Sequence, residues 1–253
     1  MTPSRKLFLP RLLSKWGVAS RAQAEALVCA GRVAVNGIVC RDMIFSVDPE
    51  RDRIALDGRE LNVAAKCRGF EYILVNKPRG MVTTTHDPEG RPTVMDLVRE
   101  VKAPGLAPVG RLDMDSGGLL LMTNDHDLAD RLLNPCSHVS KVYEAKVFGH
   151  VTEEVLQRLG QETVETEGLS LGPIQGRILS KGTRSTWLRL ELREGKNRQI
   201  RRQLAFYGHK VKVLIRTAIG PVKLTDDLEP GRYRRLTEAE LTLLKKGFEH
   251  RRR

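Results

Sequence analysis

A continuous apolar run at residues 118–123, GLLLMT, constrains the fold of this chain more than any other segment. A run without alternating polar residues is typical of a strand that is buried on both faces. Such a strand needs neighbouring strands beside it and a second layer above it, so a substantial core must surround it. The chain has 253 residues, which is enough for one or two domains with a core of that kind.

Other strand and helix patterns surround this run in an irregular order. Strands are predicted at residues 72–75, 141–148 and 187–192, and helices at 94–101, 125–133, 152–159 and 197–207. Gly160 and Gly208 are expected to end the last two of these helices, and Thr237 with Glu240 forms a capping box that opens another helix. The order lacks the regular strand–helix–strand rhythm of a parallel sheet. The sequence therefore predicts an α+β fold with a mainly antiparallel sheet.

The first 66 residues are predicted to form a separate small module of two helices and a hairpin. Apolar residues at helical spacing predict one helix within residues 7–16 and a second helix that begins at Ser20 and ends at Gly31. The dipeptide at residues 36–37, Asn-Gly, is the preferred two-residue hairpin turn, and it separates short strands at 33–35 and 38–40. With a linker near residues 64–69, we expect one domain at 1–66 and a larger one at 67–253.

The stretch RLLSKWGVASRAQAEALVCAGRVAVNG within this module resembles the S4 RNA-binding domain. The resemblance implies affinity for RNA and no chemistry, and a generic helix–helix–hairpin cap is the alternative. Four basic residues of the module are predicted to contact RNA: Arg11, Lys15, Arg21 and Arg32.

The charge of the chain favours an acidic partner. Lysine and arginine number 43 against 31 acidic residues, a formal net charge of +12. Nucleic acid is the commonest partner of such a chain, and a basic surface that serves solubility is the alternative. Residues 187–216 carry nine basic and two acidic residues, so much of the excess lies in one patterned segment. No apolar stretch has the length of a membrane span and the N-terminus lacks signal-peptide features, so we expect a cytoplasmic protein without membrane contact.

The cysteines and histidines do not form metal-binding or catalytic patterns. Cys29, Cys40, Cys67 and Cys136 are far apart and include no CxxC pair. A zinc site would need clustered ligands, so we predict no metal site and reduced thiols.

The segment at residues 110–121, GRLDMDSGGLLL, is the strongest candidate for chemistry. It places Asp113, Asp115 and Arg111 in a glycine-bounded loop that runs into the buried strand. A loop held by a rigid strand can position a nucleophile or base. An aspartate at such a place is also a common turn former, so the residues alone leave both roles open.

The segment GRLDMDSGGLLLMTND resembles the second motif of the RsuA/RluB/RluE/RluF family of ribosomal RNA pseudouridine synthases. Three further segments resemble motifs of that family in the same order: YILVNKPRG at 72–80, KVYE at 141–144 and EGKNRQIRR at 194–202. An N-terminal S4 domain is also common in the family. The resemblance therefore extends over nearly the whole chain.

This resemblance implies that the chain converts uridine to pseudouridine in ribosomal RNA, without a cofactor. Asp113 matches the essential aspartate, which either attacks C1′ of the ribose or removes a proton from C2′. Tyr143 matches the tyrosine that packs on the uracil. Arg201 matches the basic residue that pairs with the aspartate and would keep it charged.

Further basic residues are implied to contact the RNA around the extruded base: Arg111, Arg198 and Arg202. Arg198 and Arg202 are also expected to be i, i+4 neighbours on a helix, where a solvated face is the simplest role. Asp115 is interpreted as a residue that stabilises the loop, and Lys77 and Arg79 as possible phosphate contacts.

In the segment NRQIR, Arg201 stands where the small-subunit type of the family tends to have lysine, so the resemblance favours the large-subunit (23S) branch. A small-subunit (16S) enzyme and a noncatalytic RNA-binding assembly factor on the same fold are the alternatives. An S4-bearing tRNA synthetase is excluded because the chain has no nucleotide-binding signature. We expect a monomer that acts on ribosomal RNA or a ribosome-assembly intermediate.

Overall fold

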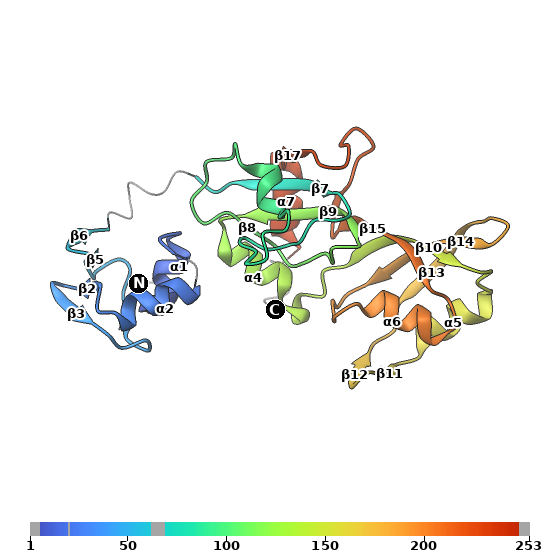
Figure 1. Cartoon of the computed structure of the whole chain (residues 1–253), viewed down its shortest axis with the longest axis horizontal. Helices are drawn as coiled ribbons and strands as arrows, with labels where there is room; N and C mark the ends of the chain where they lie inside the picture. The colour runs from blue at the N-terminus through green and yellow to red at the C-terminus, as the bar shows by residue number, and fades with distance from the viewer. Residues whose placement is uncertain (1–5, 20, 62–68, 248–253) are drawn as a thin grey trace. The chain divides into compact units, whose positions relative to one another are not determined.

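The structure, a computed structural model, describes residues 6–19, 21–61 and 69–247, and the chain forms two compact units (Figure 1). The first unit is built mainly on residues up to 71, together with residues 101–107 and 123–126. The second unit comprises residues 72–100, 108–122 and those from 127 onward. Ser20 and the predicted domain boundary after residue 66 lie outside the described residues.

The N-terminal unit has the predicted two helices and hairpin. Its helices are α1 (Leu9–Lys15) and α2 (Arg21–Cys29). Its strands are β1 (Leu7–Phe8), β2 (Val33–Val35), β3 (Ile38–Cys40), β4 (Ser46–Val47), β5 (Ile54–Leu56) and β6 (Arg59–Glu60). Strands β3-β2-β5-β6 form one small sheet, and β1 pairs with β4.

The tight turn between β2 and β3 has the backbone that its sequence predicts. Asn36 and Gly37 both have positive φ angles, 52° and 85°, as a two-residue hairpin turn of this kind requires. Apolar residues of both helices pack against the sheet, and the core of this unit includes Leu9, Leu13 and Val28. The predicted module is therefore a small packed structure rather than an extended arm.

The second unit is built on a nine-stranded sheet (Figure 1). Its main order is β13-β14-β10-β15-β9-β7-β17, with β16 beside β15 and β8 beside β9. The strands are β7 (Tyr72–Lys77), β8 (Ala107–Pro108), β9 (Gly117–Thr123), β10 (Lys141–Phe148), β13 (Gln175–Lys181), β14 (Ser185–Leu192), β15 (Val211–Ile219), β16 (Val222–Lys223) and β17 (Tyr233–Arg235). A separate hairpin consists of β11 (Val164–Thr166) and β12 (Leu169–Leu171).

Most neighbouring strands of the large sheet run antiparallel, which confirms the predicted α+β class. The pair β9 and β15 is parallel. The apolar run that opened the sequence analysis lies in β9, and every residue of this strand is buried. The strand therefore lies between β15 and β7, as its composition requires.

Helices and helical turns pack on or beside this sheet. They are η1 (Val94–Val98), α4 (His126–Leu133), η2 (Pro135–Ser137), α5 (Glu153–Gln161), α6 (Gln199–Phe206) and α7 (Glu238–Lys246). Leu128 of α4 and Leu244 of α7 join Leu119 and Leu121 of β9 in one core cluster. Among the described residues, no helix has both the length and the hydropathy needed to cross a membrane.

Several predicted helix ends differ from the structure. Helix α5 continues through Gly160 to Gln161, because the Gln175 amide and the Ile174 N–H bind the carbonyl groups of Gly160 and Leu159. The segment predicted as a helix over 94–101 is a single short 3₁₀ turn that ends at Val98. The capping box of Thr237 and Glu240 is present at the start of α7, as predicted.

Helix α6 begins later than predicted. Its first residue is Gln199, and Arg198 precedes it in a left-handed conformation with φ 50°. Arg198 is therefore not a helical neighbour of Arg202, and its side chain leaves the helix in another direction. Gly208 has a positive φ of 83° after the helix, as a C′ glycine should.

Candidate active site

A tight turn at residues 113–116 presents the two carboxylates of the predicted motif. The Ser116 N–H donates to the Asp113 carbonyl oxygen at 3.0 Å, which closes the turn just before β9 begins. Thr83 binds the preceding residue, because its hydroxyl donates to the Leu112 carbonyl oxygen at 2.6 Å. The side chain of Asp113 remains 29% exposed, so its carboxylate can reach a ligand.

Lys77, at the end of β7, holds this turn through its ammonium group. Its side chain is 1% exposed, and its ammonium donates to the carbonyl oxygens of Pro78, Asp113 and Ser116 at 3.1, 3.1 and 2.8 Å. Burial lowers the pKa of the Lys77 ammonium to about 8, although Asp113 and Asp115 act in the opposite direction. The predicted contact of Lys77 with RNA phosphate is therefore wrong for this structure, and its role is to hold the loop.

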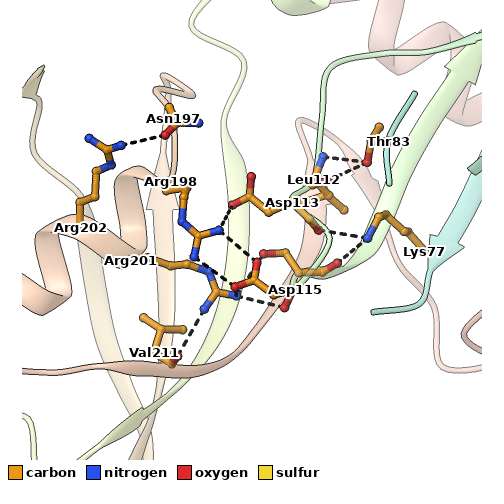
Figure 2. Close-up of polar contacts among 11 residues, drawn as sticks. Lys77, Thr83, Leu112, Asp113, Asp115, Asn197, Arg198, Arg201, Arg202 and Val211 are labelled. Atoms are coloured by element: carbon orange, nitrogen blue, oxygen red, sulfur yellow. Dashed lines mark hydrogen bonds and ion pairs between the residues drawn. The ribbon is translucent and has the colours of Figure 1, made fainter. Parts of the chain in front are cut away.

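Two arginines approach the carboxylates from the side opposite Lys77 (Figure 2). Arg198 Nη1 lies 3.4 Å from Asp113 Oδ2, and Arg198 Nη2 lies 3.1 Å from Asp115 Oδ2. Arg201, whose side chain is 12% exposed, lies 3.3 Å from Asp115 Oδ2 and donates to the Asp115 carbonyl and the Ser116 hydroxyl. Lys77 and these two arginines thus hold the turn from two sides.

The pairing within this cluster differs from the one expected for Arg201. Arg198 contacts both Asp113 and Asp115, whereas Arg201 pairs with Asp115 and not with Asp113. The cause is the left-handed backbone at Arg198, which turns this side chain toward the loop before α6 begins. Asp115 stabilises the loop, as interpreted from the sequence.

The two arginines also determine the charge state of Asp115. Burial raises the pKa of its carboxyl, but the hydrogen bond from Arg198 and the charges of Arg201 and Arg198 outweigh burial, so the pKa lies below its ordinary value. The hydrogen bond to Asp115 in turn raises the pKa of Arg198. The loop therefore carries an ionised carboxylate at Asp115 beside Asp113.

Tyr143 lies on β10 in the middle of the same sheet. It is buried, and strand pairing places it opposite Arg216 of β15. Arg216 Nη1 lies 3.5 Å from the Tyr143 hydroxyl oxygen, and Arg216 Nε donates to the carbonyl oxygen of Leu119 in β9 at 2.8 Å. Arg216 therefore connects the tyrosine strand with the strand that follows the Asp113 loop.

The remaining predicted residues have varied surroundings. Arg111 is exposed and belongs to the same loop. Arg202 contacts Asn197 at 2.9 Å and Glu167 at 2.8 Å, and it points away from Asp113 and Asp115 (Figure 2). In the N-terminal unit, Arg21 pairs with Glu25 and Arg32 with Asp57 at the surface. Two further basic residues of that unit lie on α1: Arg11 and Lys15.

Sequence reasoning missed Arg216 as a member of the site. The signal was available, because Arg216 is a charged residue inside the alternating segment VKVLIRTAI at 211–219. A charge in such a strand is rarely buried without a specific role. Lys77 carried a similar signal, since it directly follows the apolar residues of β7.

The arrangement offers a partly exposed carboxylate on a loop whose backbone is fixed at both ends. Basic side chains surround it, and a buried tyrosine lies on a strand of the same sheet. Such a site can attack an electron-poor carbon or remove a proton, and it can hold a negatively charged substrate.

Comparison with protein families supports this chemistry. Residues 71–206 match the model of the RNA pseudouridylate synthase family, and residues 9–51 match the S4 domain. A protein of Aquifex aeolicus named as an uncharacterized RNA pseudouridine synthase is 40% identical over 94% of this chain and 93% of its own length.

Two further relatives agree with this family match. The ribosomal large subunit pseudouridine synthase B of Pseudomonas aeruginosa is 37% identical over 93% of this chain, which spans 61% of that protein. A solved structure described as a pseudouridylate synthase superposes with a TM-score of 0.67 at 28% identity, and it covers 94% of this chain and 99% of its own.

Proposed function

The chain belongs to the RNA pseudouridylate synthase family, and on that premise we propose that it isomerises uridine to pseudouridine in large-subunit ribosomal RNA. The subunit is inferred from the name of the Pseudomonas aeruginosa relative, which matches 93% of this chain. The S4 match supports a second contact with RNA outside the catalytic unit.

The observation that carries this proposal is the Asp113 carboxylate, which the turn presents at the protein surface. Isomerisation requires that the bond between C1′ of the ribose and N1 of uracil breaks and that C5 then bonds to C1′. We assign the first step to Asp113, by attack at C1′ or by removal of a proton from C2′. Both routes need a carboxylate that is held still, and the ammonium of Lys77 supports the backbone of this residue.

The other predicted residues surround the ribose and base in this proposal. Tyr143 packs on the uracil, and Arg201 maintains the loop through Asp115. A uridine within folded RNA must leave its stack before reaction, so phosphate contacts beside the site are needed to hold it extruded. We assign these contacts to Arg111, Arg198 and Arg202.

The basic residues of the N-terminal unit bind RNA phosphate in this proposal: Arg11, Lys15, Arg21 and Arg32. The surface ion pairs of Arg21 and Arg32 are weak obstacles, because exposed pairs contribute only about 0–1 kcal/mol. We propose domains at 1–66 and 67–253 and activity in the cytoplasm. The monomeric state stays a prediction.

The test uses purified protein with transcribed 23S and 16S ribosomal RNA. Pseudouridine is mapped by carbodiimide modification and primer extension after incubation with wild type, Asp113→Asn or Asp115→Asn. We expect wild type to modify 23S RNA, Asp113→Asn to form no pseudouridine while binding RNA like wild type, and Asp115→Asn to keep reduced activity.

Each alternative gives a different result in this assay. Modification of 16S RNA alone would assign the enzyme to the small subunit. Full activity in Asp113→Asn would contradict the assignment of the carboxylate. A wild-type protein that binds both RNAs and modifies neither, including RNA in assembly particles, would indicate a noncatalytic assembly factor.

A further inference from the structure

The buried Arg216 in the centre of the large sheet has no carboxylate partner in the described part of the chain. Its side chain is 4% exposed, and its two hydrogen bonds go to the Leu119 carbonyl and the Tyr143 hydroxyl. Its Nη2 is buried and has no hydrogen-bond partner among the described residues. A buried cation without an anion is unfavourable, so Arg216 points to an anion that binds or forms beside it.

A second cation lies close to the same tyrosine. Lys141 precedes Tyr143 by two residues on β10, and strand alternation places both side chains on one face of the sheet. No hydrogen bond or ion pair joins the Lys141 ammonium to another described residue. Burial, and to a lesser extent the charge of Arg216, lowers the pKa of Lys141, as expected for two cations that share no anion.

The pairing of the strands places Arg216 beside Tyr143 and next to the strand that follows the Asp113 loop. An irregularity in the pairing of β10 with β15 sets Arg216 directly opposite Tyr143. Gly118 of β9 pairs with Arg216 and allows the backbones to come very close, since a Cβ on Gly118 would lie 2.3 Å from the Arg216 carbonyl oxygen. The loop that carries Asp113 runs directly into this part of β9.

The reaction of the proposed function produces the anion that these cations lack. When the bond between C1′ and N1 breaks, its electron pair stays with the base, and uracil becomes an anion with charge on N1, O2 and O4. Meanwhile Asp113 either bonds to C1′ as N1 leaves, or takes the C2′ proton and leaves a C1′–C2′ double bond. The base then turns, and the π electrons of its C5–C6 bond form the bond from C5 to C1′, while the bond to Asp113 breaks or the proton returns to C2′. The C5 proton then leaves, and N1 gains a proton. Both routes open to Asp113 pass through this separation of charge.

We propose that Lys141 and Arg216 stabilise the negative charge of the detached uracil beside Tyr143. This inference rests on the proposed function and adds a role for two residues outside the assigned catalytic set. Arg216 is buried and Lys141 is half-buried. Cations already placed in such a site stabilise a developing charge strongly, because little reorganisation is needed when it forms. Their mutual repulsion is relieved only when the anion appears, so they favour the transition state over the bound uridine.

The experiment compares Lys141→Met with the matched control Lys146→Met. Lys146 is on the same strand but on the opposite face, where its ammonium lies 5.7 Å from the centre of the Trp187 ring. Single-turnover rates are measured on a transcript that carries the mapped site as uridine or as 5-fluorouridine. Loss of the starting nucleoside is followed by nuclease digestion and chromatography, and RNA affinity by filter binding.

We expect Lys141→Met to slow base detachment from uridine by about tenfold or more, with RNA affinity unchanged. The defect should be smaller with 5-fluorouridine, because fluorine stabilises the anion of the base and reduces the need for the cation. Lys146→Met should react like wild type on both RNAs. Arg216→Lys, which keeps the charge and is checked by thermal melting, should retain more activity than Arg216→Gln.

A merely structural role for Lys141 would slow both substrates equally, and that result would overturn the inference. An unchanged rate in Lys141→Met, or an equal loss in Lys146→Met, would also overturn it. If wild type left both bases intact, the proposed function itself would fail. If wild type reacts but Lys141→Met is not slowed more on uridine than on 5-fluorouridine, the role of Lys141 fails and the proposed function stands.

Discussion

Replacing Lys77 with methionine tests whether its ammonium holds the Asp113 loop. Methionine has a similar length but cannot donate to the carbonyl oxygens of Pro78, Asp113 and Ser116, which the ammonium contacts at 3.1, 3.1 and 2.8 Å. Buried acceptors without donors are unfavourable, so the turn should move to satisfy them. A displacement of about 1 Å at a reacting group can cost about 10²-fold in rate, and we expect a loss of that order with RNA affinity unchanged.

The Lys77→Met variant should also change how the free energy of unfolding depends on pH, by an amount that follows from the pKa of Lys77. The Lys77 pKa falls from 10.5 to about 8 on folding, and burial is the largest cause. The unfolded chain therefore binds more protons between these values, and the stability of the folded state rises with pH in that range. From the two pKa values, the contribution of Lys77 to the free energy of unfolding rises by about 2.5 kcal/mol between pH 7 and pH 10. The Lys77→Met variant lacks this rise.

Urea unfolding of both proteins at pH 7 and pH 10 measures this quantity. The difference between wild type and variant cancels the titration of other groups, so its change with pH reports Lys77 alone. Pseudouridine formation at pH 7 is measured on the same preparations. A difference in unfolding free energy that stays the same at both pH values, or an unimpaired rate in the variant, would refute the role of the ammonium.

Two further predictions concern the sheet and the C-terminal helix. Gly118→Ala places a Cβ 2.3 Å from the Arg216 carbonyl oxygen, at a residue with φ +99°. We therefore expect thermal melting to show a destabilisation of about 3 kcal/mol or more. The control is Gly195→Ala, whose Cβ enters open space and should change stability by no more than about 0.5 kcal/mol. Equal melting of the two variants would show that the close approach is unimportant. The hydrogen bond from Arg234 is the main reason why the pKa of Glu240 is about 2, below its ordinary 4.5. The ionised Glu240 therefore stabilises the folded state above about pH 4.5, and this stabilisation is lost as the pH falls toward 2. Glu240→Gln should therefore lower the free energy of unfolding by about 2–3 kcal/mol at pH 7 and by much less near pH 2, and an equal loss at both pH values would contradict this explanation.

The parts of the fold with strong local patterns could be predicted from the sequence. The strand 141–148 was predicted at its observed limits, because its side chains alternate clearly and both ends lie in polar segments. The start of α6 was wrong by two residues, since Arg198 has a backbone conformation that its residue type rarely adopts. The Arg198 side chain, expected on the surface of a helix, therefore contacts the Asp113 carboxylate instead.

The contacts of the site were less predictable than its residues. Asp113, Tyr143 and Arg201 were proposed because their segments resemble the motifs of the family, but the pairing of Arg201 with Asp115 depends on how α6 meets the loop. A special role for Arg216 could be read from its place in a strand, but its partners could not, because Tyr143 and Leu119 are 73 and 97 residues away in the chain. Local patterns carry no information about such pairs.

The same separation has a consequence for how the protein is made. Parallel pairing of β9 with β15 must join residues that are almost 100 positions apart, as the 97-residue separation of Leu119 from Arg216 shows. Contacts of that range form slowly, because a long loop must close before they give any stability. The core and the small sheet of the N-terminal unit are built from residues up to 61, such as the hairpin of Val35 and Ile38, and these residues leave the ribosome first. A nascent chain can therefore fold its basic module well before β15 has been synthesised and the groups around Asp113 and Tyr143 can come together.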